Sequence, residues 1–496
     1  MEQSKKRFLK NMVGFSMVTW ISFAIGLISS PISTRLFPPA ELAKINLFSH
    51  YSALLASFCY LGLDQAFVRF FREPPGKGSR KSMFTFCAAI SVGLCVLIGL
   101  ALAVGWRPLS AQVTGEADAG VFAALCIFSV CCVLFRYLSL SYRMEQNAKL
   151  YTLQGVVHVI VTKIAYLSAG FGSADGRSAV LLLTLLMGVF TFVCLWVQRN
   201  RFMPRFWTET DSVFRKEIVA FAAPLAPITV VSALNAAVSP LVLNNLADKT
   251  AVGIFTSAAV LASTVNVIQT GFNTYWAPYV YENYQNDNKR RFFTVHRLMA
   301  CLLTMFGLTV TLLQTPVFWL LGKSYRAASV FFPFLFLAPI CYCLSETTGM
   351  GINIAKKTYW NTLVFLASAL TNIALCYLLI PVMGTAGAAV ASAFAAVLSL
   401  GLRTWAGERY YRAILDYRYA VYTVGLLLAA SFGNLWLSDN PPLQYALLGG
   451  LWLLAFWLYR REIAQLWQTA MQVLREGVKV LSRQAPKAGD EKQEEK

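Results

Sequence analysis

The sequence has little charge and few of the side chains on which catalysis and metal binding depend. Only 14% of its 496 residues are Asp, Glu, Lys or Arg, and only three are His, whereas about a quarter of the residues in a soluble domain are charged. The three His, at positions 50, 158 and 296, lie on separate apolar segments and are too few for a metal site. The chain also lacks the G-x-x-x-x-G-K-[ST] loop that binds ATP in many proteins. These absences argue against a soluble enzyme, and we expect no cofactor.

Apolar residues dominate the chain instead, and they lie in long blocks. They make up 57% of the residues, and the mean hydropathy is +0.55. The blocks are about 20 residues long, the length with which a helix crosses roughly 30 Å of hydrocarbon. This pattern predicts an all-α polytopic membrane protein with about 14 transmembrane helices. The expected spans are 12–33, 43–63, 83–105, 121–140, 150–171, 179–197, 218–243, 251–274, 298–320, 328–351, 360–380, 385–402, 419–437 and 442–459.

The net charge of +19 follows the predicted topology rather than a nucleic-acid surface. With the amino terminus in the cytoplasm, the cytoplasmic segments hold 35 of the 43 Lys and Arg residues and the outer loops hold 7. This asymmetry is the positive-inside bias of membrane proteins. We therefore expect a multi-pass protein with both termini in the cytoplasm, and no nucleic-acid partner.

The two halves of the chain show a weak internal repeat. Shifting residues 11–69 by 209 positions onto 220–278 pairs Pro31 with Pro240 and Gly62 with Gly271 at matching points of the spans. Because each half has an even number of spans, both halves begin on the same side, which predicts two parallel six-helix lobes around a central cavity. The predicted divisions are an amino-terminal lobe (1–197), a cytoplasmic linker (198–216), a carboxy-terminal lobe (217–402), two further spans (403–459), a basic amphipathic helix on the membrane (460–484) and a disordered tail (485–496).

Polar residues at helical spacing within the spans are candidates for the cavity wall, because a polar group that faces lipid is costly. Packing between helices is the alternative role for such residues. The candidates on the fifth, seventh and eighth spans are Gln154, His158, Lys163, Asn235, Asn266, Gln269 and Asn273.

Ionisable residues inside the spans point to more specific roles. Lys163 lies beyond the midplane of the fifth span, and with His158 one turn below it would hold an anionic group. Glu346 in the tenth span and Asp64 at the end of the second are candidates for binding a coupling cation. A structural ion pair is the alternative for Lys163 and Glu346. Asp64 and Arg35 lie at span ends, from which a side chain also reaches the lipid headgroups.

Several short motifs resemble those of Wzx-type polysaccharide transporters, which belong to the multidrug/oligosaccharidyl-lipid/polysaccharide (MOP) exporter superfamily. The motifs are Thr34-Arg35-Leu36-Phe37-Pro38-Pro39-Ala40-Glu41, Leu61-Gly62-Leu63 with Arg69, Val252-Gly253-Ile254-Phe255, and Pro381-Val382-Met383-Gly384-Thr385-Ala386-Gly387-Ala388-Ala389. Arg35 matches the Arg of the opening motif, which makes it a further candidate for substrate binding in the cavity, but Ala43 stands where the family usually has Gly.

The resemblance implies two six-helix lobes that form a V-shaped cavity, with two further helices. It implies that the protein flips an isoprenoid-pyrophosphate-linked glycan across the bacterial cytoplasmic membrane. Membrane lipids and the polysaccharide assembly machinery are the other expected partners. A cationic cavity and coupling to a proton or sodium gradient are also expected from the family. Obvious cations within the spans are few, chiefly Lys163.

Three alternatives remain at this point. A flippase for peptidoglycan lipid II shares the architecture. A multidrug/cation antiporter of the same superfamily more often has twelve spans and acidic residues in its cavity. A membrane glycosyltransferase needs an outward-facing acidic pair or a sizeable outer loop, and the sequence has neither.

Overall fold

The predicted all-α membrane architecture is confirmed. The computed structural model describes residues 2–172, 174–205, 207, 210–285, 289–468 and 471, and every regular element within them is a helix. In this part of the chain, 11 helices are long and apolar enough to cross a membrane, or up to 14 if each of three bent pairs is one span. These helices coincide with the fourteen spans predicted from the apolar blocks.

The amino-terminal half contains six spans and short connecting helices. These elements are α1 (Glu2–Leu36), α2 (Pro39–Tyr60), α3 (Leu63–Phe70), α4 (Arg80–Ala103), α5 (Trp106–Thr114), α6 (Ala119–Met144), α7 (Ala148–Lys163), η1 (Ala165–Phe171), α8 (Gly176–Val197) and η2 (Arg199–Arg201).

The carboxy-terminal half contains the remaining spans. Its elements are α10 (Ser212–Ala222), η3 (Ala223–Leu225), α11 (Ala226–Leu246), α12 (Lys249–Ala262), α13 (Val265–Asn283), α14 (Lys289–Leu312), α15 (Gln314–Trp319), η4 (Lys323–Val330), α16 (Phe332–Thr348), α17 (Met350–Ile354), α18 (Tyr359–Met383), α19 (Thr385–Tyr410), α20 (Arg418–Trp436) and α21 (Pro441–Leu458).

Side-chain caps determine where several spans begin. Asp118, Asp175 and Asp248 accept hydrogen bonds from the free backbone N–H groups at the starts of α6, α8 and α12. Such caps satisfy donors that have no partner within the helix. Ser79 and Ser82 form a reciprocal capping pair at the start of α4. Short polar residues between apolar blocks therefore define the span boundaries.

The second span of each half is broken, although the two breaks do not fall at matching positions of the repeat. The axes of α2 and α3 differ by 55°, and those of α12 and α13 by 41°. At the first break Gly62 has φ +79°, and a Cβ there would lie 2.5 Å from the carbonyl oxygen of Ala222. Glycine is required because it tolerates positive φ and this close backbone approach.

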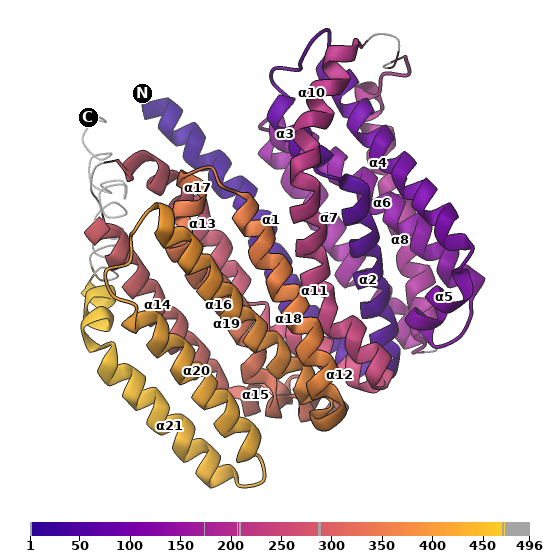
Figure 1. Cartoon of the computed structure of the whole chain (residues 1–496). Helices are drawn as coiled ribbons and strands as arrows, with labels where there is room; N and C mark the ends of the chain where they lie inside the picture. The colour runs from indigo at the N-terminus through magenta and orange to yellow at the C-terminus, as the bar shows by residue number, and fades with distance from the viewer. Residues whose placement is uncertain are drawn as a thin grey trace, which may run out of the picture.

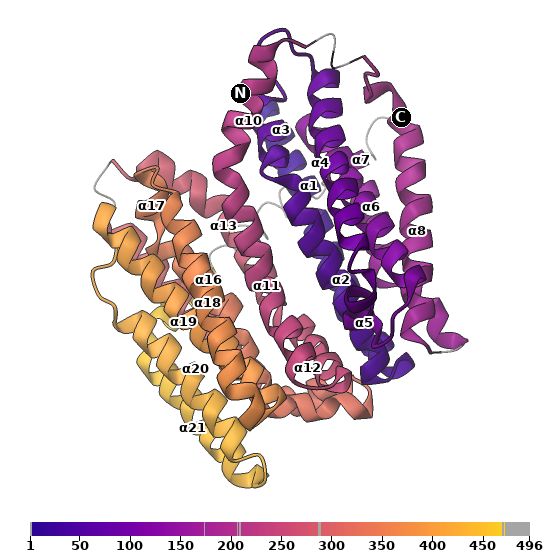
Figure 2. The same ribbon diagram turned by 45° about the vertical axis from the view of Figure 1, so that its right-hand side comes forward.

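The two lobes converge at one end and diverge at the other (Figures 1 and 2). They meet where α2 packs against α11 and α12, and we call this the closed end. Their helices separate toward the end where α10, α13 and α17 lie. The seventh span joins both lobes, because Phe214 and Ile218 of α10 pack in the amino-terminal core while α11 packs against α18.

The last two spans are fixed to the carboxy-terminal lobe by polar contacts. Gln444 of α21 donates a hydrogen bond of 2.7 Å to Asn434 of α20, which also contacts Gln314 of α15. Residues 460–468 continue as a helix, and Glu462 pairs with Arg297 at 3.4 Å. The predicted amphipathic helix beyond residue 471 and the predicted disordered tail at 485–496 lie outside the described residues.

Candidate functional site

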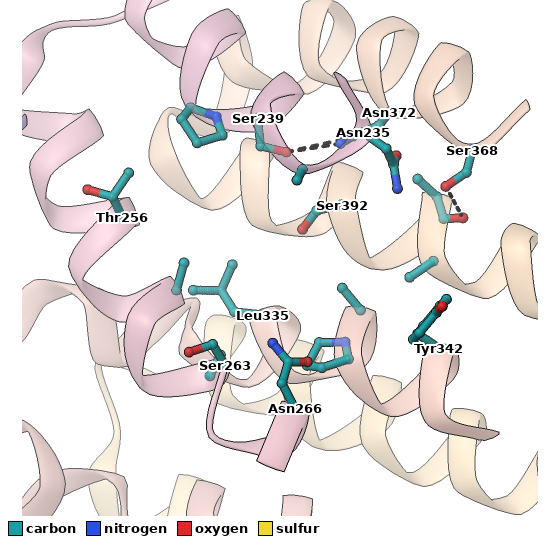
Figure 3. A pocket seen from close by; sticks show the side chains of 18 of the residues that line it. Asn235, Ser239, Thr256, Ser263, Asn266, Leu335, Tyr342, Ser368, Asn372 and Ser392 are labelled. Atoms are coloured by element: carbon teal, nitrogen blue, oxygen red, sulfur yellow. Dashed lines mark hydrogen bonds between the residues drawn. The ribbon is translucent and has the colours of Figure 1, made fainter. Parts of the chain in front are cut away.

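The main cavity is a chamber of about 720 Å³ within the carboxy-terminal lobe. Residues of α11, α12, α13, α16, α18 and α19 form its wall (Figure 3). Among the described lining residues, only Asn46 and His50 of α2 come from the amino-terminal lobe. The predicted central cavity is therefore off-centre, because the walls belong almost entirely to one lobe.

Neutral polar groups line this chamber. Among the cavity candidates from the sequence, Asn235, Asn266 and Gln269 lie on its wall. The Asn372 amide donates a hydrogen bond of 3.1 Å to the Ser239 hydroxyl, which joins α18 to α11 (Figure 3). None of the described residues that line the chamber is Asp, Glu, Lys or Arg.

A second cavity of about 280 Å³ adjoins the chamber and contains Lys163. Its wall comes from α1, α7 and the break between α12 and α13, and it shares Val260, Ser263 and Asn266 with the chamber. The half-buried Lys163 ammonium donates a hydrogen bond of 3.3 Å to the Ser22 carbonyl oxygen. Because an ammonium has three donors, two remain for another acceptor.

Four other residues predicted to line the cavity lie outside both cavity walls. The His158 ring stacks on Phe135, with ring centroids 4.0 Å apart and planes 6° from parallel. Gln154 is buried on the same helix, and Arg35 is exposed at the end of α1. The described residues that line the two cavities do not include His158, Gln154, Arg35 or Asn273 of α13. The His158 ring therefore packs on Phe135 and does not line the Lys163 cavity.

Both predicted ion-coupling residues are paired with arginine. Asp64 lies 2.9 Å from the guanidinium of Arg136, and Glu346 lies 2.9 Å from that of Arg403. Arg403 also donates to the Ser345 hydroxyl at 2.8 Å. Sequence reasoning missed both arginines because it counted them with the cytoplasmic segments, although the predicted span 121–140 includes Arg136. The signal was available for Arg403, since the Ala-rich helical pattern of α19 continues through it.

At the closed end, the lobes make close backbone contacts that the sequence did not reveal. A Cβ at Gly253 of α12 would lie 1.9 Å from the Pro39 carbonyl oxygen, and one at Gly322 would lie 2.1 Å from the Thr34 carbonyl oxygen. The Tyr325 hydroxyl donates a hydrogen bond of 2.8 Å to the Phe37 carbonyl oxygen. We call these contacts, together with the 2.8 Å hydrogen bond from Asn46 to Thr256, the end gate.

Comparison with known proteins identifies the family. Residues 8–284, more than half of the chain, match the family described as polysaccharide biosynthesis protein. The chain belongs to this family. No curated protein matches the chain by sequence.

Solved structures of the MOP superfamily share the fold of this polysaccharide biosynthesis protein. The lipid II flippase MurJ in its inward closed conformation aligns with a TM-score of 0.62 and 14% identity, over 90% of this chain and 99% of MurJ. An inward-facing MATE multidrug resistance transporter aligns with a TM-score of 0.53 and 16% identity, over 80% of this chain and 97% of that one. Likenesses at this identity define the fold alone.

Proposed function

We propose that this polysaccharide biosynthesis family member is a flippase of the Wzx type, a transporter rather than an enzyme. It would carry an isoprenoid-pyrophosphate-linked oligosaccharide across the bacterial cytoplasmic membrane for cell-surface polysaccharide synthesis. The observation that supports this most is a chamber whose described wall carries amides and hydroxyls but no Asp, Glu, Lys or Arg, in a protein whose family is described as polysaccharide biosynthesis protein.

The physical need for such a chamber follows from the chemistry of sugars. A glycan that enters hydrocarbon loses its hydrogen bonds to water, at roughly 2–7 kcal/mol for each unsatisfied polar group. The amides and hydroxyls of the chamber would replace those bonds while the lipid tail stays in the bilayer. Both termini would lie in the cytoplasm, so that the divergent end faces inward and the end gate faces outward.

Lys163 would hold the pyrophosphate. Its cavity adjoins the chamber at Asn266, so the anionic link and the first sugars would occupy neighbouring sites. Gly26 leaves room for the ammonium, since a Cβ there would lie 3.0 Å from the Lys163 nitrogen. The contacts of an ammonium with phosphate oxygens are charge-assisted and therefore strong.

Coupling to a proton or sodium gradient remains part of the proposal. Asp64 is buried, and within the described part of the chain its Oδ1 atom has no hydrogen-bond partner while Oδ2 contacts Arg136. A proton or cation at Oδ1 would weaken that ion pair, because it cancels the charge that Arg136 neutralises. Glu346 and Arg403 form the second pair that an ion would disturb in this way.

Export rescue tests the proposal in bacteria that lack their own capsule or O-antigen flippase. Restored surface polysaccharide without resistance to cationic drugs is the expected result. Lys163→Ala should abolish at least nine-tenths of the export at unchanged protein level, whereas the exposed Lys149 on the same helix should tolerate Lys149→Ala. Drug resistance without rescue would instead identify an antiporter, and rescue of a lipid II flippase mutant would identify a peptidoglycan flippase.

A further inference from the structure

We propose that the chamber selects for uncharged sugars at the lipid-linked end of the glycan and disfavours acidic sugars there. This inference rests on the proposed function and specifies its substrate class. In this proposal, the Lys163 cavity alone binds the negatively charged part of the substrate. The carboxy-terminal lobe recognises the first sugars.

The chamber offers hydrogen bonds without charge. Its amide side chains include Asn235, Asn266, Gln269 and Asn372. An amide carries both donors and an acceptor, so it can pair with a sugar hydroxyl or acetamido group in either direction. A carboxylate, in contrast, only accepts hydrogen bonds and needs a counter-ion when it leaves water. Within the described lining, no Lys or Arg is present to supply one, and His50 is the one side chain there that can take up a positive charge.

One cation behind the wall, Arg403, is already neutralised by an ion pair. The Arg403 guanidinium lies over the Tyr342 ring, 5.3 Å from its centroid, and Tyr342 lines the chamber. Arg403 itself is buried, is not part of the lining, and pairs with Glu346 at 2.9 Å. Its charge is therefore not offered to a ligand in the chamber.

The apolar part of the wall suits a sugar ring. The rings of Tyr342 and Phe365 stack with centroids 6.1 Å apart, and both residues line the chamber. Ala259 and Ala396 place small apolar side chains on other parts of the wall. The volume of about 720 Å³ lies within the range of small-molecule sites. Apolar surface with a few placed polar groups is the usual composition of such sites.

The position of the junction between the two cavities determines which sugars of the glycan contact the chamber wall. Val260, Ser263 and Asn266 belong to both walls. When a pyrophosphate lies at Lys163, the sugar bonded to it can enter the chamber past Asn266. The chamber therefore receives the sugars at the lipid-linked end, and the distal part of a longer glycan extends beyond it.

Export of paired glycans tests the selection in the flippase-deficient bacteria. One strain would make a repeat unit with neutral sugars at the lipid-linked end, and the other the same unit with one of these replaced by a uronic acid. We expect at least tenfold more export of the neutral unit. Asn235→Lys should reverse this preference by at least tenfold, and the matched control Asn235→Gln should keep it. Asn266→Lys provides a second variant if Asn235→Lys fails to accumulate.

Equal export of both units by the natural protein would overturn the selection, as would an unchanged ratio in both lysine variants. Export of neither unit would count against the proposed function instead. In that case, ligand-observed NMR on the purified full chain decides the inference. A disaccharide of N-acetylglucosamine should bind, and one of N-acetylglucosamine with glucuronic acid should bind only to the Asn235→Lys variant. Equal binding of both probes to the natural protein would overturn the inference.

Discussion

Replacing Gly253 with alanine would place a methyl group in the tightest contact of the end gate. The new Cβ would lie 1.9 Å from the Pro39 carbonyl oxygen and 2.6 Å from its carbon, and side-chain Cβ atoms essentially never approach within 3.0 Å. The contact involves backbone on the Pro39 side, so no side-chain rotation relieves it. The two helices must therefore move apart by about 1.1 Å, the difference between 1.9 and 3.0 Å.

Two terms oppose the closed gate in this variant. Overpacking of a well-packed contact costs about 1–3 kcal/mol. The same separation stretches the 2.8 Å hydrogen bond from Asn46 to Thr256 beyond bonding distance. The closed gate thereby loses a further stabilisation of about 0.5–1.5 kcal/mol. Alanine is also the better residue within a helix by about 0.5–1 kcal/mol, so α12 itself is not weakened. A net shift of about 1.5–4.5 kcal/mol corresponds to a roughly 10- to 2,000-fold change in the ratio of closed to open gates.

Thiol labelling measures this shift in intact cells. In a background whose eleven native cysteines are replaced, Ala259→Cys places one thiol on the chamber wall. A membrane-impermeant maleimide should label it faster when Gly253→Ala is also present, while export falls because the inward-loading state is depleted. Gly271→Ala is the matched control, since a Cβ there meets no atom within 4 Å. An unchanged labelling rate at normal protein level would refute the reasoning, because the lobes would then accommodate the methyl group locally.

Three further predictions concern single contacts. Tyr325→Phe removes one hydrogen bond of the end gate, worth about 0.5–1.5 kcal/mol. It should raise the maleimide labelling rate of the Ala259→Cys thiol two- to tenfold. No increase would show that this bond does not hold the gate. Glu346→Gln leaves the buried Arg403 without its carboxylate partner, which costs about 3–5 kcal/mol and should lower the unfolding temperature in detergent. Adding Arg403→Met should restore part of the lost unfolding temperature. An additive loss in the double variant would contradict the pairing. A hydrogen bond from Arg177 holds the pKa of Asp118 below its usual range, so this pair stabilises the fold at neutral pH and the contribution is lost as the pH falls through that lowered pKa. Arg177→Gln should therefore reduce the unfolding temperature at pH 7 more than at the acid end of a titration, and an equal reduction at both would argue against a role for the pair.

The spans and their repeat were predictable from the sequence because they depend on local properties. A run of about 20 apolar residues must form a helix in hydrocarbon, since the backbone has no other partner for its polar groups. The breaks at α2–α3 and α12–α13 were not predicted, although Gly62 marked one of them. They depend on where neighbouring backbone approaches, as the Ala222 carbonyl approaches Gly62.

The site was only partly predictable, because its residues are assembled by contacts between distant segments. Helical spacing selected Asn235, Asn266 and Gln269, which lie on the chamber wall, since a single helix determines which residues share a face. Spacing could not show that His158 stacks on Phe135 or that Glu346 meets Arg403, because the rotation and neighbours of each helix are set by packing across the whole lobe. The end gate depended on tertiary structure in the same way: Gly253 and Pro39 are far apart in the chain, and only the docking of α12 on α2 brings their backbones into contact.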